Sequence, residues 1–312
     1  MWLLKPLAIM KILVPAVLAA VCVQPVLACD LCSIYAATEA QAGSGKGFFG
    51  GVALQYTDFN TFKSDGRSAP NPDNEFIHSL SSQVFIGYNF SERLGVQFNL
   101  PVIWREYGQV AAHGSELGLG DVSLIGNARL YQHLSENFTF NWTALGGIKF
   151  PAGDSVWLGR PDFAAGIGGH DLALGSGSFD GIIGTGFFAR WKKTFFTGSM
   201  QYAIRTEGDF QHQYANDWLW FGGPGAYLVL GHKYTLALQA AVSGESKGKD
   251  TFAGVADGDS AETIVYAGPQ INFTWGSKLS AQVGADLPVS YDNSGDQILP
   301  TYRIRAALMW RF

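Results

Sequence analysis

Apolar and polar residues alternate with a period of two along most of the chain after residue 46. In residues 137–151, for example, Phe138, Phe140 and Trp142 fall on one face of an extended chain. Thr139 and Asn141 fall on the other face. Successive side chains of a β-strand point to opposite sides, so this pattern predicts half-buried strands. The alternation alone fits a soluble sandwich as well as a barrel.

The lengths of the connections separate these two folds. We expect about 12 strands, at residues 47–60, 77–90, 93–105, 118–132, 137–150, 176–191, 194–207, 217–231, 233–244, 262–275, 278–290 and 300–312. Short joins alternate with long ones, and transmembrane barrels have brief periplasmic turns and extended outer loops. The sequence therefore predicts an all-β fold, a transmembrane antiparallel β-barrel with both chain ends in the periplasm. Aromatic residues near both ends of the predicted strands fit two interfacial girdles, with Phe195 expected in the periplasmic one.

The first residues have the order of a secretory signal. Lys5 and Lys11 precede an apolar run, and Ala28 fits the small-residue rule for cleavage before Cys29. We expect an exported protein with a signal peptide at 1–28, a periplasmic segment at 29–46 and an outer-membrane barrel at 47–312. Cys29 and Cys32 form a CxxC pair, which fits a disulfide, a redox or metal pair, or a lipidated Cys29; a structural or redox-exposed pair is favoured.

Lipid-facing charge is costly, and this sets the register. A basic side chain against midplane lipid costs about 2–4 kcal/mol, so charged strand residues should point inward or sit at a rim. The candidate lumen-lining residues are Arg105, Asp121, Arg129, Lys149, Arg190, Arg205, Asp286, Arg303 and Arg305. Inward glycines such as Gly87, Gly186 and Gly268 either leave space in the lumen or relieve strand curvature.

The longest predicted loop, residues 151–175, is a candidate constriction. Loops of this length without structure of their own are often functional, and we expect this one to fold over or into the barrel mouth. Its candidate residues are Asp154, Trp157, Arg160, His170 and Asp171. His170 and Asp171 are adjacent and would point apart on an extended chain, so we expect no metal site here.

Little in the sequence indicates catalysis or nucleic-acid binding. Only 15% of residues are charged and the pI is near 5.7, so the basic surface that phosphate backbones require is absent. The close Ser and His pairs, such as His78-Ser79, lack the surrounding pattern of outer-membrane phospholipases. We expect no enzyme, no cofactor and no metal.

Two short motifs resemble a known family. Leu100-Pro101-Val102 followed by Gly118-Leu119-Gly120-Asp121 is similar to the family of outer-membrane barrels assigned to the meta-pathway of phenol degradation. The resemblance implies passage of small, often aromatic, hydrophobic compounds across the outer membrane.

Together these features predict an outer-membrane channel or uptake pore for small molecules, working by passive diffusion. The alternative is a structural or binding barrel that engages a periplasmic redox partner through the Cys29 and Cys32 end. The expected partners are outer-membrane lipid and lipopolysaccharide, a small-molecule solute, and the barrel-assembly machinery. The machinery would read the last strand, which alternates to a terminal Phe312.

Overall fold

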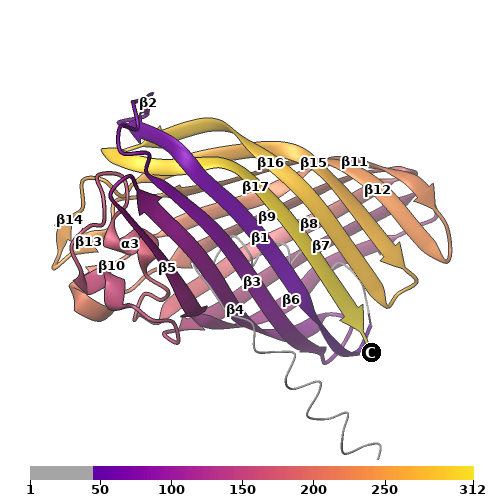
Figure 1. Ribbon diagram of the computed structural model, residues 1–312. Helices are drawn as coiled ribbons and strands as arrows, with labels where there is room; N and C mark the ends of the chain where they lie inside the picture. Colours follow the sequence, from indigo (N-terminus) through magenta and orange to yellow (C-terminus); the bar gives the residue numbers. More distant parts are fainter. Residues whose placement is uncertain (1–44) are drawn as a thin grey trace, which may run out of the picture.

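The computed structural model describes residues 45–312, which form one closed antiparallel barrel (Figure 1). The 12-strand barrel that the sequence predicts is confirmed. Its strands are β1 (Gly47–Ser64), β3 (Phe76–Asn89), β4 (Leu94–Gln109), β6 (Val122–Leu134), β7 (Phe138–Phe150), β8 (Asp180–Trp191), β9 (Thr194–Ile204), β11 (Asp217–Leu230), β12 (Tyr234–Lys247), β15 (Glu262–Trp275), β16 (Leu279–Asn293) and β17 (Asp296–Arg311). Each pairs with the next in this order, and β17 pairs with β1 to close the sheet.

The two ends of the barrel differ in their connections. At one end, the turn end, β3–β4, β6–β7, β8–β9, β11–β12 and β15–β16 are joined by short turns. At the other, the loop end, most connections are long and carry small elements. These are β2 (Arg67–Ser68), β5 (Ala112–Leu119), η1 (Val156–Gly159), α3 (Gly169–Leu172), η2 (Asp209–Gln211), β10 (His212–Gln213), β13 (Thr251–Phe252) and β14 (Val255–Ala256). None of the described helices is long and apolar enough to cross a membrane.

Two predicted boundaries are wrong at the loop end. The predicted strand 118–132 is divided, because β5 forms a hairpin with the upper part of β4 and the chain reaches β6 only after Gly120 and Asp121. The predicted long join 291–299 is mostly strand. Gly295, with φ 62°, allows a tight turn between β16 and β17 that most other residues would adopt only with strain.

Side chains sort by face as the register argument requires. On β3, Val84 and Ile86 lie on the outer face and are 50% and 56% exposed, whereas Gln83 lies on the inner face and is 1% exposed. Aromatic residues such as Trp191 and Trp310 are exposed at the turn end, and Trp218 is exposed at the loop end. Phe195 is an exception, because it faces the interior and is buried against Gly225. The barrel therefore has an apolar outer surface and a largely polar interior.

Candidate functional site

The candidate site is the interior of the barrel together with the segment that fills its loop end. Residues 151–179, here called the plug loop, run from β7 to β8 and turn into the lumen (Figure 1). Leu158, Ile167 and Leu172 of the plug loop are buried in one apolar cluster with Ile77 of β3 and Ile298 of β17. The loop thus packs against a remote part of the barrel wall through apolar side chains.

Polar contacts fix the plug loop at both of its sides. Asp121 accepts hydrogen bonds from the backbone N–H groups of Ala152 (3.1 Å), Gly153 (3.0 Å) and Ser176 (3.0 Å). Two strands farther along the wall, the buried carboxylate of Glu75 accepts one from the N–H of Gly166 (2.8 Å). Because irregular backbone inside a barrel needs such partners, these two carboxylates define where the loop docks.

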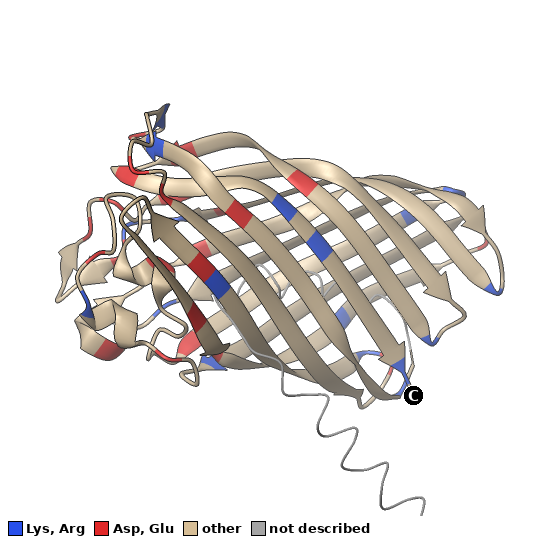
Figure 2. Cartoon of the chain, viewed as in Figure 1, with Lys and Arg blue, Asp and Glu red and all other residues tan. Residues whose placement is uncertain are grey.

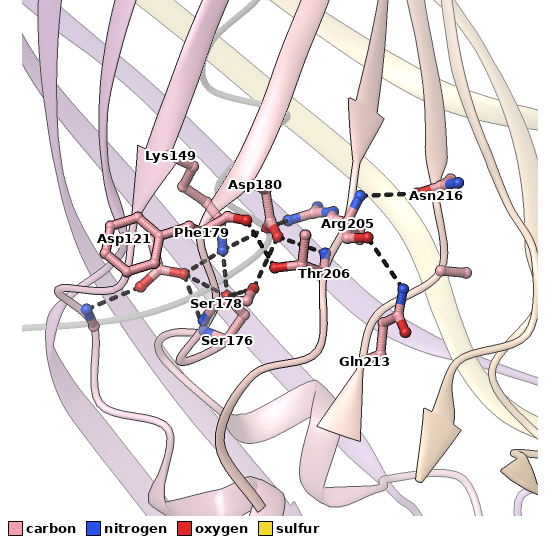
Figure 3. A network of polar contacts seen from close by, with 12 residues as sticks. Asp121, Lys149, Ser176, Ser178, Phe179, Asp180, Arg205, Thr206, Gln213 and Asn216 are labelled. Atoms are coloured by element: carbon pink, nitrogen blue, oxygen red, sulfur yellow. Dashed lines mark hydrogen bonds and ion pairs between the residues drawn. The ribbon is translucent and has the colours of Figure 1, made fainter. Parts of the chain in front are cut away.

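A buried charge network lies directly beneath the plug loop (Figure 3). Lys149 forms ion pairs with Asp121 and, at 2.8 Å, with Asp180, while Arg205 lies 2.9 Å from Asp180. Ser178 of the plug loop donates to Asp180 at 2.9 Å. Two cations and two anions balance, which buried charge requires. Removing one partner of such a network typically costs about 3–5 kcal/mol.

The plug-loop residues singled out from the sequence occupy different environments. Asp154 accepts the N–H of Val156 (2.9 Å), and the Arg160 guanidinium lies over the buried Trp157 ring at 4.6 Å. The expectation that His170 and Asp171 point apart is wrong. Their side chains lie 3.4 Å apart, because α3 makes this segment a helical turn rather than an extended chain.

A second titratable cluster involves the neighbouring loops. The His212 ring stacks on His170 with centroids 6.5 Å apart, and the Tyr214 hydroxyl donates to the His170 carbonyl at 3.0 Å. His212 Nε2 lies 4.0 Å from a carboxylate oxygen of the fully buried Asp250. Burial lowers the pKa of His212 below its usual 6.5, and burial also raises the pKa of the Tyr214 hydroxyl. At neutral pH the cluster therefore holds neutral His212.

Two arginines and one aspartate occupy the middle of the lumen. Arg303 Nε and Arg305 Nε lie 3.1 Å and 2.7 Å from Asp286 Oδ2. The same guanidinium groups lie over the rings of Tyr266 (3.9 Å) and Phe221 (4.6 Å). All three charged side chains are buried. These charged and aromatic side chains form a packed group on the inner wall of the barrel.

The remaining lumen candidates also face the interior. Arg105 of β4 is 5% exposed near the loop end. Arg190 of β8 lies at the turn end, where its guanidinium donates to the carbonyls of Glu136 (3.3 Å) and Lys192 (3.0 Å). Arg129 of β6 lines the cavity described next.

Below the central arginines, an open cavity of about 490 Å³ extends to the turn end. Turn residues such as Ser91 and Gly276 line its mouth, and Gln239 and Gln282 line its inner part. We call this cavity the vestibule. The vestibule opens at the turn end, while buried charged side chains lie in the middle of the lumen and apolar plug-loop residues are buried near the loop end.

Sequence reasoning missed a set of buried carboxamides on the inner wall. Gln97 donates to Asn99 at 2.6 Å, and Gln239 donates to Thr197 at 2.7 Å. The signal was present, because these residues share the inward parity of their strands, but the predicted lumen-lining residues included only charged ones. The other members are Gln55, Gln83, Gln201 and Gln270.

No candidate metal site is present within residues 45–312. No three His, Cys, Asp or Glu side chains there converge to hold a metal ion. His78 lies between Asp58 (3.2 Å) and Glu106 (3.8 Å), while the adjacent Ser79 is buried on the opposite face of the strand. Cys29 and Cys32 lie outside the described residues.

The chain was compared with known proteins. No protein-family model matches it, and no curated protein matches it. Among solved structures it is similar to an outer membrane channel from Pseudomonas putida F1, with a TM-score of 0.64 and 15% identity over 87% of this chain and 98% of that one.

Two other structures resemble it less. The translocator domain of the autotransporter NalP from Neisseria meningitidis has a TM-score of 0.44 and 12% identity over 97% of this chain and 98% of that one. The beta domain of the Bordetella autotransporter Brka has a TM-score of 0.45 and 9% identity over 85% and 99%. The likeness to the Pseudomonas putida structure shows that this chain has the fold of an outer-membrane β-barrel channel.

Proposed function

We propose that this protein is an outer-membrane channel that admits small molecules by passive diffusion, with the plug loop as its constriction. The observation that carries the proposal is the internal layout of the barrel. A vestibule of about 490 Å³ opens at one end, and at the other end the plug loop is docked against the barrel wall by hydrogen bonds and apolar contacts. A loop held in this way can shift without breaking the barrel wall.

The proposed setting follows from the outer surface. The apolar band of the barrel would contact lipid and lipopolysaccharide, with the turn end in the periplasm and the loop end outside the cell. The signal peptide expected at residues 1–28 would provide export. The channel would then need no cofactor and carry out no reaction.

The proposed solutes are small, aromatic or hydrophobic molecules among them. Phe188, Phe195 and Tyr227 line the vestibule among hydroxyl and carboxamide groups. Such mixed walls accommodate a flat apolar ring with polar substituents. The resemblance to barrels of the phenol meta-pathway family is consistent with this choice.

Deleting residues 164–169 tests the role of the plug loop. This segment contains the fully buried Ile167 and the Gly166 N–H that Glu75 binds, so its removal undocks the loop. We expect single-channel conductance in planar bilayers to rise several-fold and small sugars to enter proteoliposomes faster.

A matched control shortens another loop-end segment. Residues 253–256 form an exposed hairpin tip in which Val255 is 71% exposed. Shortening this tip should leave conductance unchanged. If the 164–169 deletion, folded in the membrane, conducts no more than the parent protein, the plug loop is not the constriction. If neither the parent protein nor the 164–169 deletion conducts, the channel proposal itself fails.

A further inference from the structure

Charge is distributed unequally between the two ends of the barrel. Among residues 45–312, the acidic side chains at the turn end are Glu92 and Glu136, whereas the rim there carries Lys46, Arg93, Lys192, Lys193, Lys233 and Lys278. Figure 2 shows red concentrated toward the loop end and blue at the tips of the turn end. The turn end thus carries more positive than negative side chains, and a mouth with an excess of one sign of charge raises the local concentration of ions of the opposite sign.

Two arginines of the vestibule differ from the cationic side chains deeper in the lumen in having no ion-pair partner among the described residues. Lys149, Arg205, Arg303 and Arg305 each lie in a buried ion pair with an aspartate. Arg129 and Arg311 line the vestibule, and neither forms an ion pair with any described residue. Arg129 donates only to the neutral amide of Gln132 (3.2 Å). Glu92 also lines the vestibule and acts on Arg129 electrostatically without forming an ion pair, whereas no carboxylate of the described residues acts in this way on Arg311.

The vestibule also contains hydrogen-bond donors that lack an acceptor. Within the described residues, the buried Nε of Arg311 and the buried Nδ2 of Asn127 have no hydrogen-bond partner. Both side chains line the vestibule, and both atoms are donors. Leaving a buried donor without an acceptor is unfavourable, so a ligand that brings acceptor oxygens would be stabilised here.

Aromatic rings in the vestibule offer an apolar surface for the part of a ligand that carries no charge. Phe188 and Phe195 stack with centroids 5.9 Å apart, and Tyr227 lies 5.2 Å from Phe195. All three line the same cavity. The vestibule thus combines unpaired cations, unsatisfied donors and an apolar wall.

We propose that the vestibule is a binding site for small organic carboxylates, held at the carboxylate by Arg129 and Arg311. The planar guanidinium group matches a carboxylate with two parallel hydrogen bonds, and the rings receive the apolar part of the ligand. The assignment names a solute class for the channel proposed above and rests on that proposal for its physiological role. Binding itself does not depend on conduction.

The test uses benzoate and its uncharged isostere benzamide as probes. Each is titrated calorimetrically into the purified, detergent-solubilised full-length mature protein. We expect benzoate to bind at least about tenfold more tightly than benzamide, because only the carboxylate can accept charge-assisted hydrogen bonds. Benzoate affinity should fall as the KCl concentration is raised.

Substitutions in the vestibule identify the residues responsible. The double variant Arg129→Gln with Arg311→Gln should lose benzoate affinity about tenfold or more, with benzamide unchanged. The double variant to Lys should retain part of the affinity, which separates lost charge from misfolding. Lys192→Gln removes one charge from the same end, where the ammonium lies over the Trp191 ring outside the vestibule lining, and should bind normally.

The outcomes separate this inference from the channel proposal. Equal affinity for benzoate and benzamide, or unchanged benzoate binding in the double Gln variant, would overturn the carboxylate site. A barrel that binds benzoate but conducts no solute, even after deletion of residues 164–169, would retain the site and refute the channel. A barrel that conducts but does not bind benzoate would retain the channel proposal and refute the carboxylate site.

Discussion

At the scale of single residues, several inward glycines are places of close packing rather than empty space. A Cβ atom added at Gly87 would lie 2.2 Å from the Phe49 ring, and one at Gly225 would lie 2.2 Å from the Phe195 ring. The sequence allowed either free space in the lumen or relief of curvature. In the structure, neighbouring rings occupy the volume that these missing side chains leave. The lumen is therefore narrower than its glycine content suggests.

Gly268 is a glycine where substitution should destabilise the barrel. An added Cβ would meet the backbone oxygen of Ala285 at 1.8 Å, and backbone cannot rotate away as a ring can. We expect Gly268→Ala to destabilise the folded barrel by about 2 kcal/mol or more in urea titrations followed by heat-modifiable gel migration. Gly186→Ala, whose Cβ would meet nothing closer than 3.4 Å, is the control and should be nearly neutral. Equal stability of the two variants would contradict this account.

At the scale of elements, the plug loop is held by groups from several other segments. Asp121 precedes β6, Glu75 precedes β3, and Tyr214 lies between β10 and β11. Each contacts the plug loop through a side chain or a backbone group. The docked loop is thus a property of the assembled loop end, and its stability depends on the protonation of groups in those neighbouring segments.

His212 should make docking of the plug loop sensitive to pH. Burial lowers its pKa, so the docked state binds fewer protons than a released state in which His212 has its usual pKa of 6.5. This contribution to docking is fully present above pH 6.5 and is lost as pH falls through the lowered pKa. We expect channel openings in planar bilayers to become more frequent on acidification.

His212→Gln separates this residue from the other titratable groups around it. Asp250, His170, Lys247 and Asp257 all act on His212 and remain in the variant. The part of the pH response that belongs to His212 should disappear, leaving a flatter dependence of opening frequency on pH. An unchanged pH response in His212→Gln would assign the effect to the remaining groups.

At the scale of the whole molecule, closure and size together decide how open the interior is. Pairing of β1 with β17 closes the ring of 12 strands, as a membrane barrel requires. Barrels of eight strands are filled by side chains and those of 16–18 leave a channel. This barrel of 12 strands lies between these sizes, with an open vestibule at the turn end and with the plug loop and the central arginines buried farther along the interior.

The terminal Phe312 should matter for assembly more than for stability. Its ring is 79% exposed, and its N–H donates one hydrogen bond to the Phe48 carbonyl (3.0 Å). We expect Phe312→Ala to lower the amount of folded barrel in the outer membrane of cells, because the assembly machinery would read the last strand less well. Refolding of the purified variant into detergent micelles should match the parent protein.

Phe90→Ala provides the comparison for Phe312→Ala. Phe90 is also at the turn end and is 57% exposed, but it lies outside the last strand. Its substitution should leave the amount of barrel in cells unchanged. Equal losses for the two variants would indicate a general role of interfacial aromatic residues rather than a signal in the last strand.

The sequence by itself determined the number of barrel strands and the face of most of their residues, with exceptions at residues 118–132, at residues 291–299 and at Phe195. The alternation around Phe138 and Thr139 repeats every two residues, and turning one basic side chain toward lipid is costly, so register is a local property. The inward position of Lys149 and Arg305 follows from that parity alone. Short turns such as residues 192–193 could be located for the same reason, since they lie between two clear alternating runs.

Only the tertiary structure decided what lies inside the barrel. Closure brings Ile167 against Ile77 and Ile298, and it places the Gly166 N–H on Glu75, although these residues are far apart in the chain. It also leaves Arg311 without an anionic partner among the described residues while Arg305 shares Asp286. No local pattern encodes such contacts, because they depend on which inward side chains meet across a lumen that exists only after the last strand pairs with the first.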